Sequence, residues 1–220
     1  MLNELLIPLR DYFGFLNLFE YITFRAGASA ILALLISFIF GPFIVRKLIN
    51  LQIGESIRDH GPDSHKEKQG TPTMGGVLII LSTIIPTILL ADLDNMFIQI
   101  VCLSMVWMGI VGFYDDYLKV VKKRKDGLSG RYKLLAQTIL GIFISYLLIS
   151  SNIYGDYTLS TFVPFLKNVS INFFYPIIYA LFVILVVAAT SNAVNLTDGL
   201  DGLASGLLAI SVSVFGVIAY

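Results

Sequence analysis

Six long apolar runs constrain this chain more than any other feature of its sequence. A helix needs about 20 predominantly apolar residues to cross the hydrocarbon core of a bilayer, and six segments approach that length. They cover residues 26–48, 74–91, 96–114, 134–150, 175–189 and 203–220. Charged residues make up only 14% of the chain and its mean hydropathy is +0.81, whereas roughly a quarter of a soluble domain is charged. The sequence therefore predicts an all-α integral membrane protein with six transmembrane helices.

The basic residues predict how these helices are oriented. Twelve of the 15 Lys and Arg residues lie in or next to the loops 49–73 and 115–133. If the six helices alternate in direction, these two loops share one side of the membrane with the loop 190–202. Cytoplasmic loops carry an excess of Lys and Arg. We therefore expect these three loops to face the cytoplasm and the N-terminus to lie outside.

Residues 1–25 precede the first of the six apolar runs and are expected to lie at the membrane interface. The segment carries Glu4, Asp11 and Glu20 and lacks a basic start, which is more typical of an interfacial segment than of a cleaved signal peptide. The chain shows no internal repeat and no low-complexity linker. Residues 1–220 are therefore predicted to form a single transmembrane domain.

Two adjacent carboxylates follow the third apolar run, in the stretch GFYDDYLKV. Asp115 and Asp116 oppose the macrodipole at the C-terminus of that helix unless something positive meets them. The candidates are a Mg2+ ion, which binds carboxylates together with substrate phosphates, or the nearby Lys119 and Lys122. Neighbouring acids can also shift each other's pKa and leave one suited to act as a base. Ionisable residues at membrane depth are functional candidates, so we predict a catalytic pair, with neutralisation by the basic loop as the structural alternative.

Two further stretches on the same side are basic. HKEKQGTPTMGG leads into the second run, where Lys68 could meet a phosphate as a point charge and the glycine-rich helix start favours anions. An ordinary basic loop explains it as well, and it is not a P-loop because the Lys-Ser/Thr ending is missing. KKRKDGLSGRYK is typical of a polybasic loop that touches anionic lipid headgroups. Such a loop could also attract anionic substrates.

A polar stretch, SNAVNLTDGLDGLASG, separates the last two apolar runs. In it Asn192, Asn195, Asp198 and Asp201 recur every three residues, so on a helix each lies about 60° round from the last and they form a slowly turning stripe. Helix capping is the alternative, since Asp198 before an apolar run is a good N-cap. Capping does not account for the other three residues. Amides and carboxylates together suit hydrogen bonding to a nucleobase or ribose.

Four stretches together resemble one family. KQGTPTMGG, GFYDDYLKV, GLSGRYKLLAQ and SNAVNLTDGLDGLASG, in this order and on alternate loops, resemble the bacterial phospho-N-acetylmuramoyl-pentapeptide transferases. These enzymes belong to the polyprenyl-phosphate N-acetylhexosamine-1-phosphate transferase superfamily. The paired aspartates mark only the superfamily, while GTPTMGG together with NAVNLTDGLDGLA is specific to the muramoyl-pentapeptide members. The resemblance covers essentially the whole chain from the first apolar run onward.

The resemblance implies a phosphoglycosyl transfer in peptidoglycan synthesis. Undecaprenyl phosphate would attack the sugar-linked phosphate of UDP-N-acetylmuramoyl-pentapeptide and give lipid I and UMP, with Mg2+ as cofactor. The implied location is the bacterial inner membrane with the active face cytoplasmic. The implied partners are the two substrates and membrane lipids, with a homodimer as an open option and no nucleic acid. A covalent aspartyl intermediate and a one-step transfer both stay open.

The same resemblance implies roles for particular residues. Asp115 and Asp116 would be the catalytic pair, with Asp115 as the base that acts on the lipid phosphate. Asn195 and Asp115 would contact the metal. The residues implied for binding substrate phosphates and nucleotide are Lys68, Thr73, Asn195, Asp198 and Asp201.

The sequence departs from the family in the number of helices. The family is expected to have ten transmembrane helices, whereas six are predicted here. The other part would hold a further aspartate as the main metal ligand and a histidine-rich loop, to which His60 and His65 cannot be assigned. We therefore expect the chain to be truncated at the C-terminus, an N-terminal portion of the enzyme that is inactive alone.

Three other functions stay open. The nearest is a polyprenyl-phosphate transferase of the same superfamily that uses UDP-N-acetylglucosamine. Membrane carriers also place carboxylates in the membrane and have Gly-rich, Pro-containing helices, as Pro86 suggests for the second run. A carrier should hold its polar residues near mid-span, however, whereas here they cluster at helix ends. The third option is a non-catalytic membrane scaffold.

Overall fold

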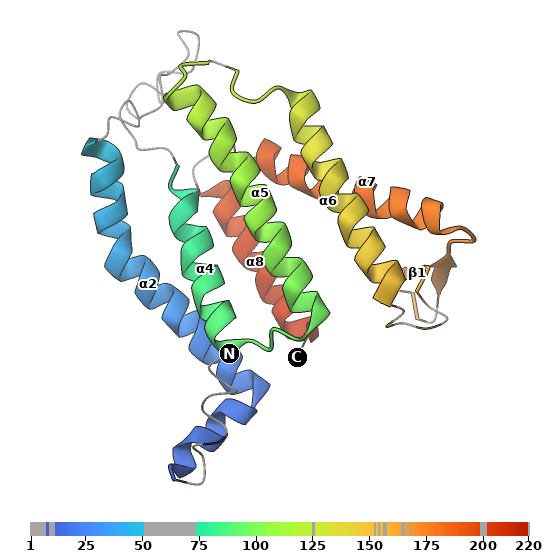
Figure 1. Cartoon of the computed structure of the whole chain (residues 1–220), viewed down its shortest axis with the longest axis horizontal. Coiled ribbons are helices and arrows are strands. Elements are labelled where there is room, and N and C mark those ends of the chain that lie inside the picture. The colour runs from blue at the N-terminus through green and yellow to red at the C-terminus, as the bar shows by residue number, and fades with distance from the viewer. Residues whose placement is uncertain are drawn as a thin grey trace. The chain divides into compact units, whose positions relative to one another are not determined.

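A computed structural model of the chain describes residues 8, 12–50, 74–124, 126–151, 153, 155, 158–163, 166–167, 169–198 and 202–219. Helices dominate these residues and confirm the expected all-α class (Figure 1). They are η2 (Gly14–Glu20), α2 (Ile22–Asn50), α4 (Gly76–Leu90), α5 (Met96–Val120), α6 (Gly130–Ser151), α7 (Pro176–Thr197) and α8 (Leu203–Ala219). Among the described residues the only strands are β1 (Ser160–Phe162) and β2 (Ser170–Asn172), which pair as a small antiparallel hairpin between α6 and α7.

Each predicted apolar run forms a helix, but the helices differ in length. The helices α2, α5, α6 and α7 have 22 to 29 residues and are long and apolar enough to cross a membrane. The helix α4 has 15 residues and α8 has 17. At about 1.5 Å per residue, α4 extends about 22 Å, less than the roughly 30 Å of a hydrocarbon core. The count of six transmembrane helices therefore stays a prediction.

Most of the long helices extend past the apolar runs that predicted them. The helix α5 continues beyond residue 114 to Val120, α7 continues beyond residue 189 to Thr197, and α2 begins at Ile22. The helices are thus longer than the predicted apolar runs, and α2 includes residues 22–25. Hydropathy falls where polar side chains begin, but a helix satisfies its own backbone groups whatever side chains it carries.

The chain divides into two compact units, residues 1–130 and 131–220. In the first unit α4 contacts both α2 and α5 (Figure 1). A Cβ atom on Gly41 of α2 would lie 3.5 Å from the Leu78 side chain of α4. In the second unit α6 and α7 come close together at Gly141, where a Cβ atom would lie 2.8 Å from the Ile184 Cα atom. Small residues allow such close approach of membrane helices. A single domain over residues 1–220 stays a prediction.

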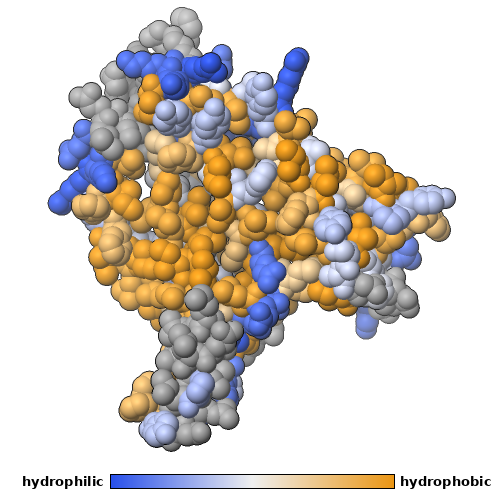
Figure 2. All heavy atoms as spheres, in the orientation of Figure 1, coloured by the Kyte–Doolittle hydropathy of each residue, from blue (hydrophilic) through white to orange (hydrophobic). Residues whose placement is uncertain are grey.

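The surface of the helices is that of a membrane protein. Large apolar side chains are exposed along them, as shown by Phe38 of α2 at 75% and Phe215 of α8 at 70%. Figure 2 shows a nearly continuous hydrophobic surface over α2 and α4, with hydrophilic residues gathered beyond the end of α5. A soluble monomer rarely exposes an apolar patch of more than a few hundred Å². Such a surface requires a lipid environment.

Candidate functional site

Asp115 lies inside α5 rather than beyond its end. The helix continues to Val120, so the carboxylate is in the second-to-last turn and the residue is only 8% exposed. The neighbouring Asp116 is half-buried and leaves the helix about 100° further round. Because of this angle, the side chains of Asp115 and Asp116 leave the helix in different directions. The apolar run predicts that both carboxylates lie at the C-terminus of the helix, whereas α5 continues for four residues beyond Asp116.

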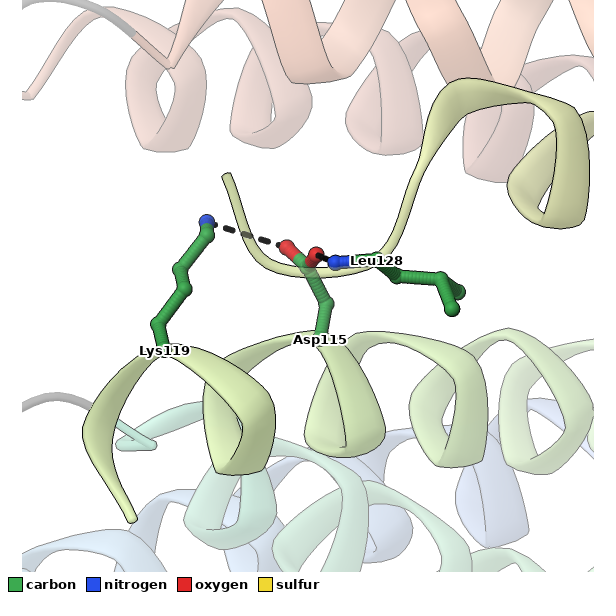
Figure 3. A network of polar contacts seen from close by, with 3 residues as sticks. All are labelled: Asp115, Lys119 and Leu128. Carbon is green, nitrogen blue, oxygen red and sulfur yellow. Dashed lines mark hydrogen bonds and ion pairs between the residues drawn. The ribbon is translucent and has the colours of Figure 1, made fainter. Parts of the chain in front are cut away.

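Two donors hold the Asp115 carboxylate (Figure 3). The Lys119 ammonium, one turn later in α5, lies 3.0 Å from Oδ2. The backbone N–H of Leu128 donates a hydrogen bond of 2.7 Å to Oδ1. Lys119 is one of the two lysines named above as candidate partners of the carboxylates, and the structure places it beside Asp115. An ammonium and an N–H donor on two different oxygens suit an ionised carboxylate, which only accepts hydrogen bonds. We refer to Asp115, Lys119 and the Leu128 N–H as the aspartate clasp.

The turn after α5 brings the Leu128 N–H back to Asp115. The N–H of Arg124 donates to the Leu118 carbonyl at 3.0 Å, and the N–H of Gly127 donates to the Arg124 carbonyl at 3.1 Å. These bonds fold the loop against the last turn of α5. The peptide N–H of Leu128 then reaches the carboxylate thirteen residues before it in the chain.

Gly127 is required by this turn for two reasons. Its φ is +60°, a left-handed conformation that a residue with a Cβ atom adopts at a cost. A Cβ atom there would also lie 2.5 Å from Oδ1 of Asp115 and 2.7 Å from Cε of Lys119. Neither Gly127 nor the Leu128 N–H is among the residues predicted from the sequence. The available signal was the dipeptide Asp126-Gly127, which marks a turn.

The polar stripe predicted after the fifth apolar run lies partly on α7. Asn192 and Asn195 are helical, and Asn195 is exposed, so the stripe is confirmed for these two residues. Asp198 is the C-cap of α7, and its N–H donates to the Val194 carbonyl at 3.2 Å. The N-cap alternative for Asp198 is wrong, because α8 begins only at Leu203. A carboxylate at a helix C-terminus opposes the macrodipole, so capping gives no reason for its presence.

The Asn192 side chain forms hydrogen bonds within the protein. Its amide donates to Gln137 of α6 and to the Ala188 carbonyl. Gln137 is not among the residues predicted from the sequence. The signal for it was an amide inside the apolar run 134–150, where a polar side chain needs a partner.

The remaining predicted residues are placed as follows. Lys68, Thr73 and Asp201 lie outside the described residues. The helix start predicted for the glycine-rich stretch is confirmed, since Gly75 is the N-cap of α4 and Gly76 its first residue. The aspartate clasp belongs to the first unit and the end of α7 to the second, so each is described by itself.

Two family descriptions match the chain. Residues 98–220, which include the aspartate clasp and the end of α7, match glycosyl transferase family 4. Residues 68–80, which include Lys68 and Thr73, match signature 1 of phospho-N-acetylmuramoyl-pentapeptide-transferase. The five implied binding residues and the two aspartates therefore all fall inside a matched segment.

Curated relatives match along the whole chain. Proteins named phospho-N-acetylmuramoyl-pentapeptide-transferase from Desulforapulum autotrophicum, Citrifermentans bemidjiense and Rickettsia felis are 47%, 46% and 46% identical over 220, 224 and 221 residues. Each alignment covers 100% of this chain and 60% of the relative. The chain thus spans about 60% of the length of these relatives. With more than half of its residues matched by the family description, the chain belongs to glycosyl transferase family 4.

Proposed function

We propose that this chain supplies the substrate-binding side of an enzyme that makes lipid I in peptidoglycan synthesis. The enzyme would transfer phospho-N-acetylmuramoyl-pentapeptide from its UDP-linked precursor to undecaprenyl phosphate and release UMP. The observation that carries the proposal is the aspartate clasp, a buried carboxylate beside a lysine near the end of a membrane helix. It lies within the segment that matches the family. The names of the relatives support the choice of substrate.

In this proposal the clasp prepares the lipid phosphate for attack. Phosphoryl transfer depends mainly on positioning and on stabilising negative charge. Asp115 would accept the proton of the lipid phosphate, while the Lys119 ammonium, 3.0 Å from the carboxylate, would stabilise the phosphate as it becomes more negative. The Leu128 N–H would keep Oδ1 oriented, which leaves Oδ2 beside Lys119 as the atom that takes the proton.

Mg2+ is the cofactor that we propose for this reaction. When bound, it would neutralise the phosphate oxygens between uridine and sugar. Mg2+ commonly takes only one or two carboxylates from the protein when substrate phosphates supply further oxygens. By donor type, the carboxylates of Asp115 and Asp116 and the amide oxygen of Asn195 are the ligands that we propose for Mg2+. In the part of the chain that the structure describes, no three His, Cys, Asp or Glu side chains gather as a ready metal site.

The other binding roles and the orientation are part of the same proposal. Lys68 and Thr73 would meet the substrate phosphates, and Asn195, Asp198 and Asp201 would bind the nucleotide. The distribution of Lys and Arg supports an active face toward the cytoplasm of the bacterial inner membrane, with the N-terminus outside. A helix end at headgroup depth suits the clasp, because one substrate is a lipid and the other is water-soluble.

The structure favours transfer over transport in one respect. Carriers of several folds bind their substrates where a helix is broken near the bilayer midplane. Pro86 was the residue that suggested such a break. The Pro86 side chain is fully buried within α4 (Gly76–Leu90), and this helix is continuous. The second predicted run therefore offers no unwound segment for a carried solute.

The test uses a chimera of this chain and the part of the Desulforapulum autotrophicum relative that the chain does not cover. Purified chimera in lipid vesicles is supplied with undecaprenyl phosphate, Mg2+ and UDP-N-acetylmuramoyl-pentapeptide, and UMP release is measured. We expect Asp115→Asn to lower the rate about 100-fold or more, the usual size of a general-base contribution. Asparagine can still accept from the Leu128 N–H, so the fold should persist.

Asp126→Asn is the matched control. Asp126 is an exposed carboxylate in the same loop, and its loss should leave the rate within about twofold of the parent, as for most surface changes. An inactive parent chimera, or an Asp115→Asn variant as fast as the parent, would contradict the proposal. Faster transfer from UDP-N-acetylglucosamine than from the muramoyl precursor would favour the rival transferase, and uptake of a labelled solute that Asp115→Asn does not affect would favour a carrier.

A further inference from the structure

A network of neutral polar side chains joins α6 to α7 within the second unit. The Gln137 Nε2 group donates to the Ser191 hydroxyl at 3.1 Å. The Gln137 Oε1 atom accepts from Asn192 Nδ2 at 3.0 Å, and the same Nδ2 group donates to the Ala188 carbonyl at 2.8 Å. Gln137 is 3% exposed. We refer to Gln137, Ser191 and Asn192 as the amide lock.

The backbone of the two helices is in close contact next to the lock. Gly141, one turn after Gln137 on α6, would place a Cβ atom 2.8 Å from Ile184 Cα and 2.9 Å from Ile184 Cγ1. Since neither helix can move closer, the distance between them is set at this point. This backbone contact does not fix the rotation of α7 about its own axis.

The lock supplies that missing constraint. Ser191 and Asn192 are consecutive residues, about 100° apart around the helix axis, and one glutamine binds both. If α7 rotates, one of these two hydrogen bonds shortens while the other lengthens. Gln137 therefore fixes the rotation of the last two turns of α7.

The residues just beyond the lock are the ones proposed to bind nucleotide. Asn195 follows Asn192 by three residues, about 60° round and about 4.5 Å further along the helix. Asp198 caps the same helix. Any rotation of α7 at the lock changes the direction in which Asn195 projects.

We propose that Gln137 is a positioning residue that orients the Asn195–Asp198 end of α7 for the uridine nucleotide. This inference rests on the proposed function for the identity of the ligand. Gln137 touches neither substrate nor metal in this role and acts through Ser191 and Asn192. The stripe of polar residues thus divides into a part that holds the helix, Asn192, and a part that faces the ligand, Asn195.

The experiment replaces Gln137 by Met, which has similar length but forms no comparable hydrogen bonds, and by Glu, which can still accept from Asn192. The first readout needs no activity. Asn195→Cys is introduced in a Cys102→Ala background of the 220-residue chain, and its modification by a water-soluble maleimide is timed in detergent. The second readout is the KM of the chimera for each substrate.

We expect Gln137→Met to change the labelling rate about threefold or more, in line with the loss of one or two interhelical hydrogen bonds. The KM for the UDP-linked precursor should rise by a similar factor, while kcat and the KM for undecaprenyl phosphate stay unchanged. Gln137→Glu should give smaller changes in both readouts, because burial keeps the introduced glutamic acid neutral, so that it accepts from Asn192 and donates to Ser191. The control is Ser145→Ala on the same helix, since the buried Ser145 hydroxyl donates only to the Ile142 carbonyl in its own helix. Circular dichroism checks that each variant keeps its helix content.

An unchanged labelling rate in Gln137→Met would overturn the inference. So would an altered labelling rate with no change in KM, because the lock would then be a structural contact only. A parent chimera that does not bind or transfer the precursor contradicts the proposed function instead, and in that case the labelling rate still decides whether Gln137 orients Asn195. If Gln137→Met loses helix content, Gln137→Glu decides by the same two readouts.

Discussion

The aspartate clasp and the amide lock both hold a helix by a buried polar side chain, but with different chemistry. The clasp is charged and local: it joins Asp115 to a lysine four residues later and to a backbone N–H 13 residues later. The lock is neutral and distant, since Gln137 bonds to residues 54 and 55 positions away in the chain. One cluster joins a helix to the loop that follows it, and the other joins two helices.

The difference follows from the partners that a buried charge and a buried neutral amide each require. A buried charge needs a partner of opposite charge and further hydrogen bonds; at this helix end Lys119 of α5 supplies the charge and the loop after α5 supplies the N–H donor. Between two helices no such loop is at hand. An amide there donates and accepts at once, so Gln137 and Asn192 satisfy each other without any charge. A charged site can exchange its partners for a substrate or an ion, whereas a satisfied neutral network keeps its geometry. The clasp therefore suits chemistry and the lock suits positioning.

Gly127→Ala is the change that should break the clasp with the largest effect. The added methyl group would lie 2.5 Å from Asp115 Oδ1, so the carboxylate must leave the Leu128 N–H. The left-handed φ of +60° adds strain, and the two effects together should destabilise the fold by about 1–3 kcal/mol. A displaced catalytic carboxylate can cost up to about 100-fold in rate. The checks are UMP release by the chimera and the unfolding midpoint in mixed detergent–SDS micelles.

Gly112→Ala is its control on the same helix. A Cβ atom on Gly112 would meet nothing within 4 Å, and alanine is a better helix former than glycine. The variant should therefore be as active as the parent and at least as stable. Equal rates for Gly127→Ala and Gly112→Ala would mean that the Leu128 N–H does not orient Asp115.

The clasp also shows how far sequence reasoning reaches in this protein. Asp115 and Lys119 could be paired in advance, because residues four apart on a helix are neighbours. The Leu128 N–H could not, because a backbone donor carries no signature in the side-chain sequence and its position depends on the φ of Gly127. The helix class was predictable from apolar runs, whereas helix ends were not, since α7 continues through polar residues to Thr197.

The lock was beyond prediction for a different reason. Gln137 stands out as an amide within an apolar run, so its need for a partner could have been inferred. Which residue it meets depends on where α6 and α7 cross, and that crossing is set by the contact of Gly141 with Ile184. Packing between segments more than 40 residues apart leaves no local pattern in either one. The sequence therefore indicated the stripe of Asn192 and Asn195 but not the division of tasks between them.

Gly141→Ala tests whether the lock depends on this crossing. The new methyl group would approach Ile184 Cα, a backbone atom, so no change of side-chain rotamer can relieve it. The helices must separate, and overpacking of this kind costs about 1–3 kcal/mol, measured as the unfolding midpoint in detergent–SDS micelles. The labelling rate of Asn195→Cys should change as well, because the hydrogen bonds of Gln137 lengthen. Gly216→Ala on α8, where a Cβ atom meets nothing within 4 Å, should change neither readout.

Lys123→Gly should have the smallest effect, and in the opposite direction. Lys123 has a φ of +53° and, unlike a glycine, carries a Cβ atom that makes this left-handed conformation unfavourable by roughly 1–2 kcal/mol. Glycine removes that strain but loses more backbone entropy on folding, by roughly 0.5–1 kcal/mol, so the net gain in stability should be about 0.5 kcal/mol. The turn that carries the Leu128 N–H would then hold the clasp at least as well, and the rate of UMP release should not fall. Lys122→Gly, at a neighbouring position that is not left-handed, should lower the unfolding midpoint instead. If both substitutions lower it equally, the conformation of Lys123 is not what limits the stability of the turn.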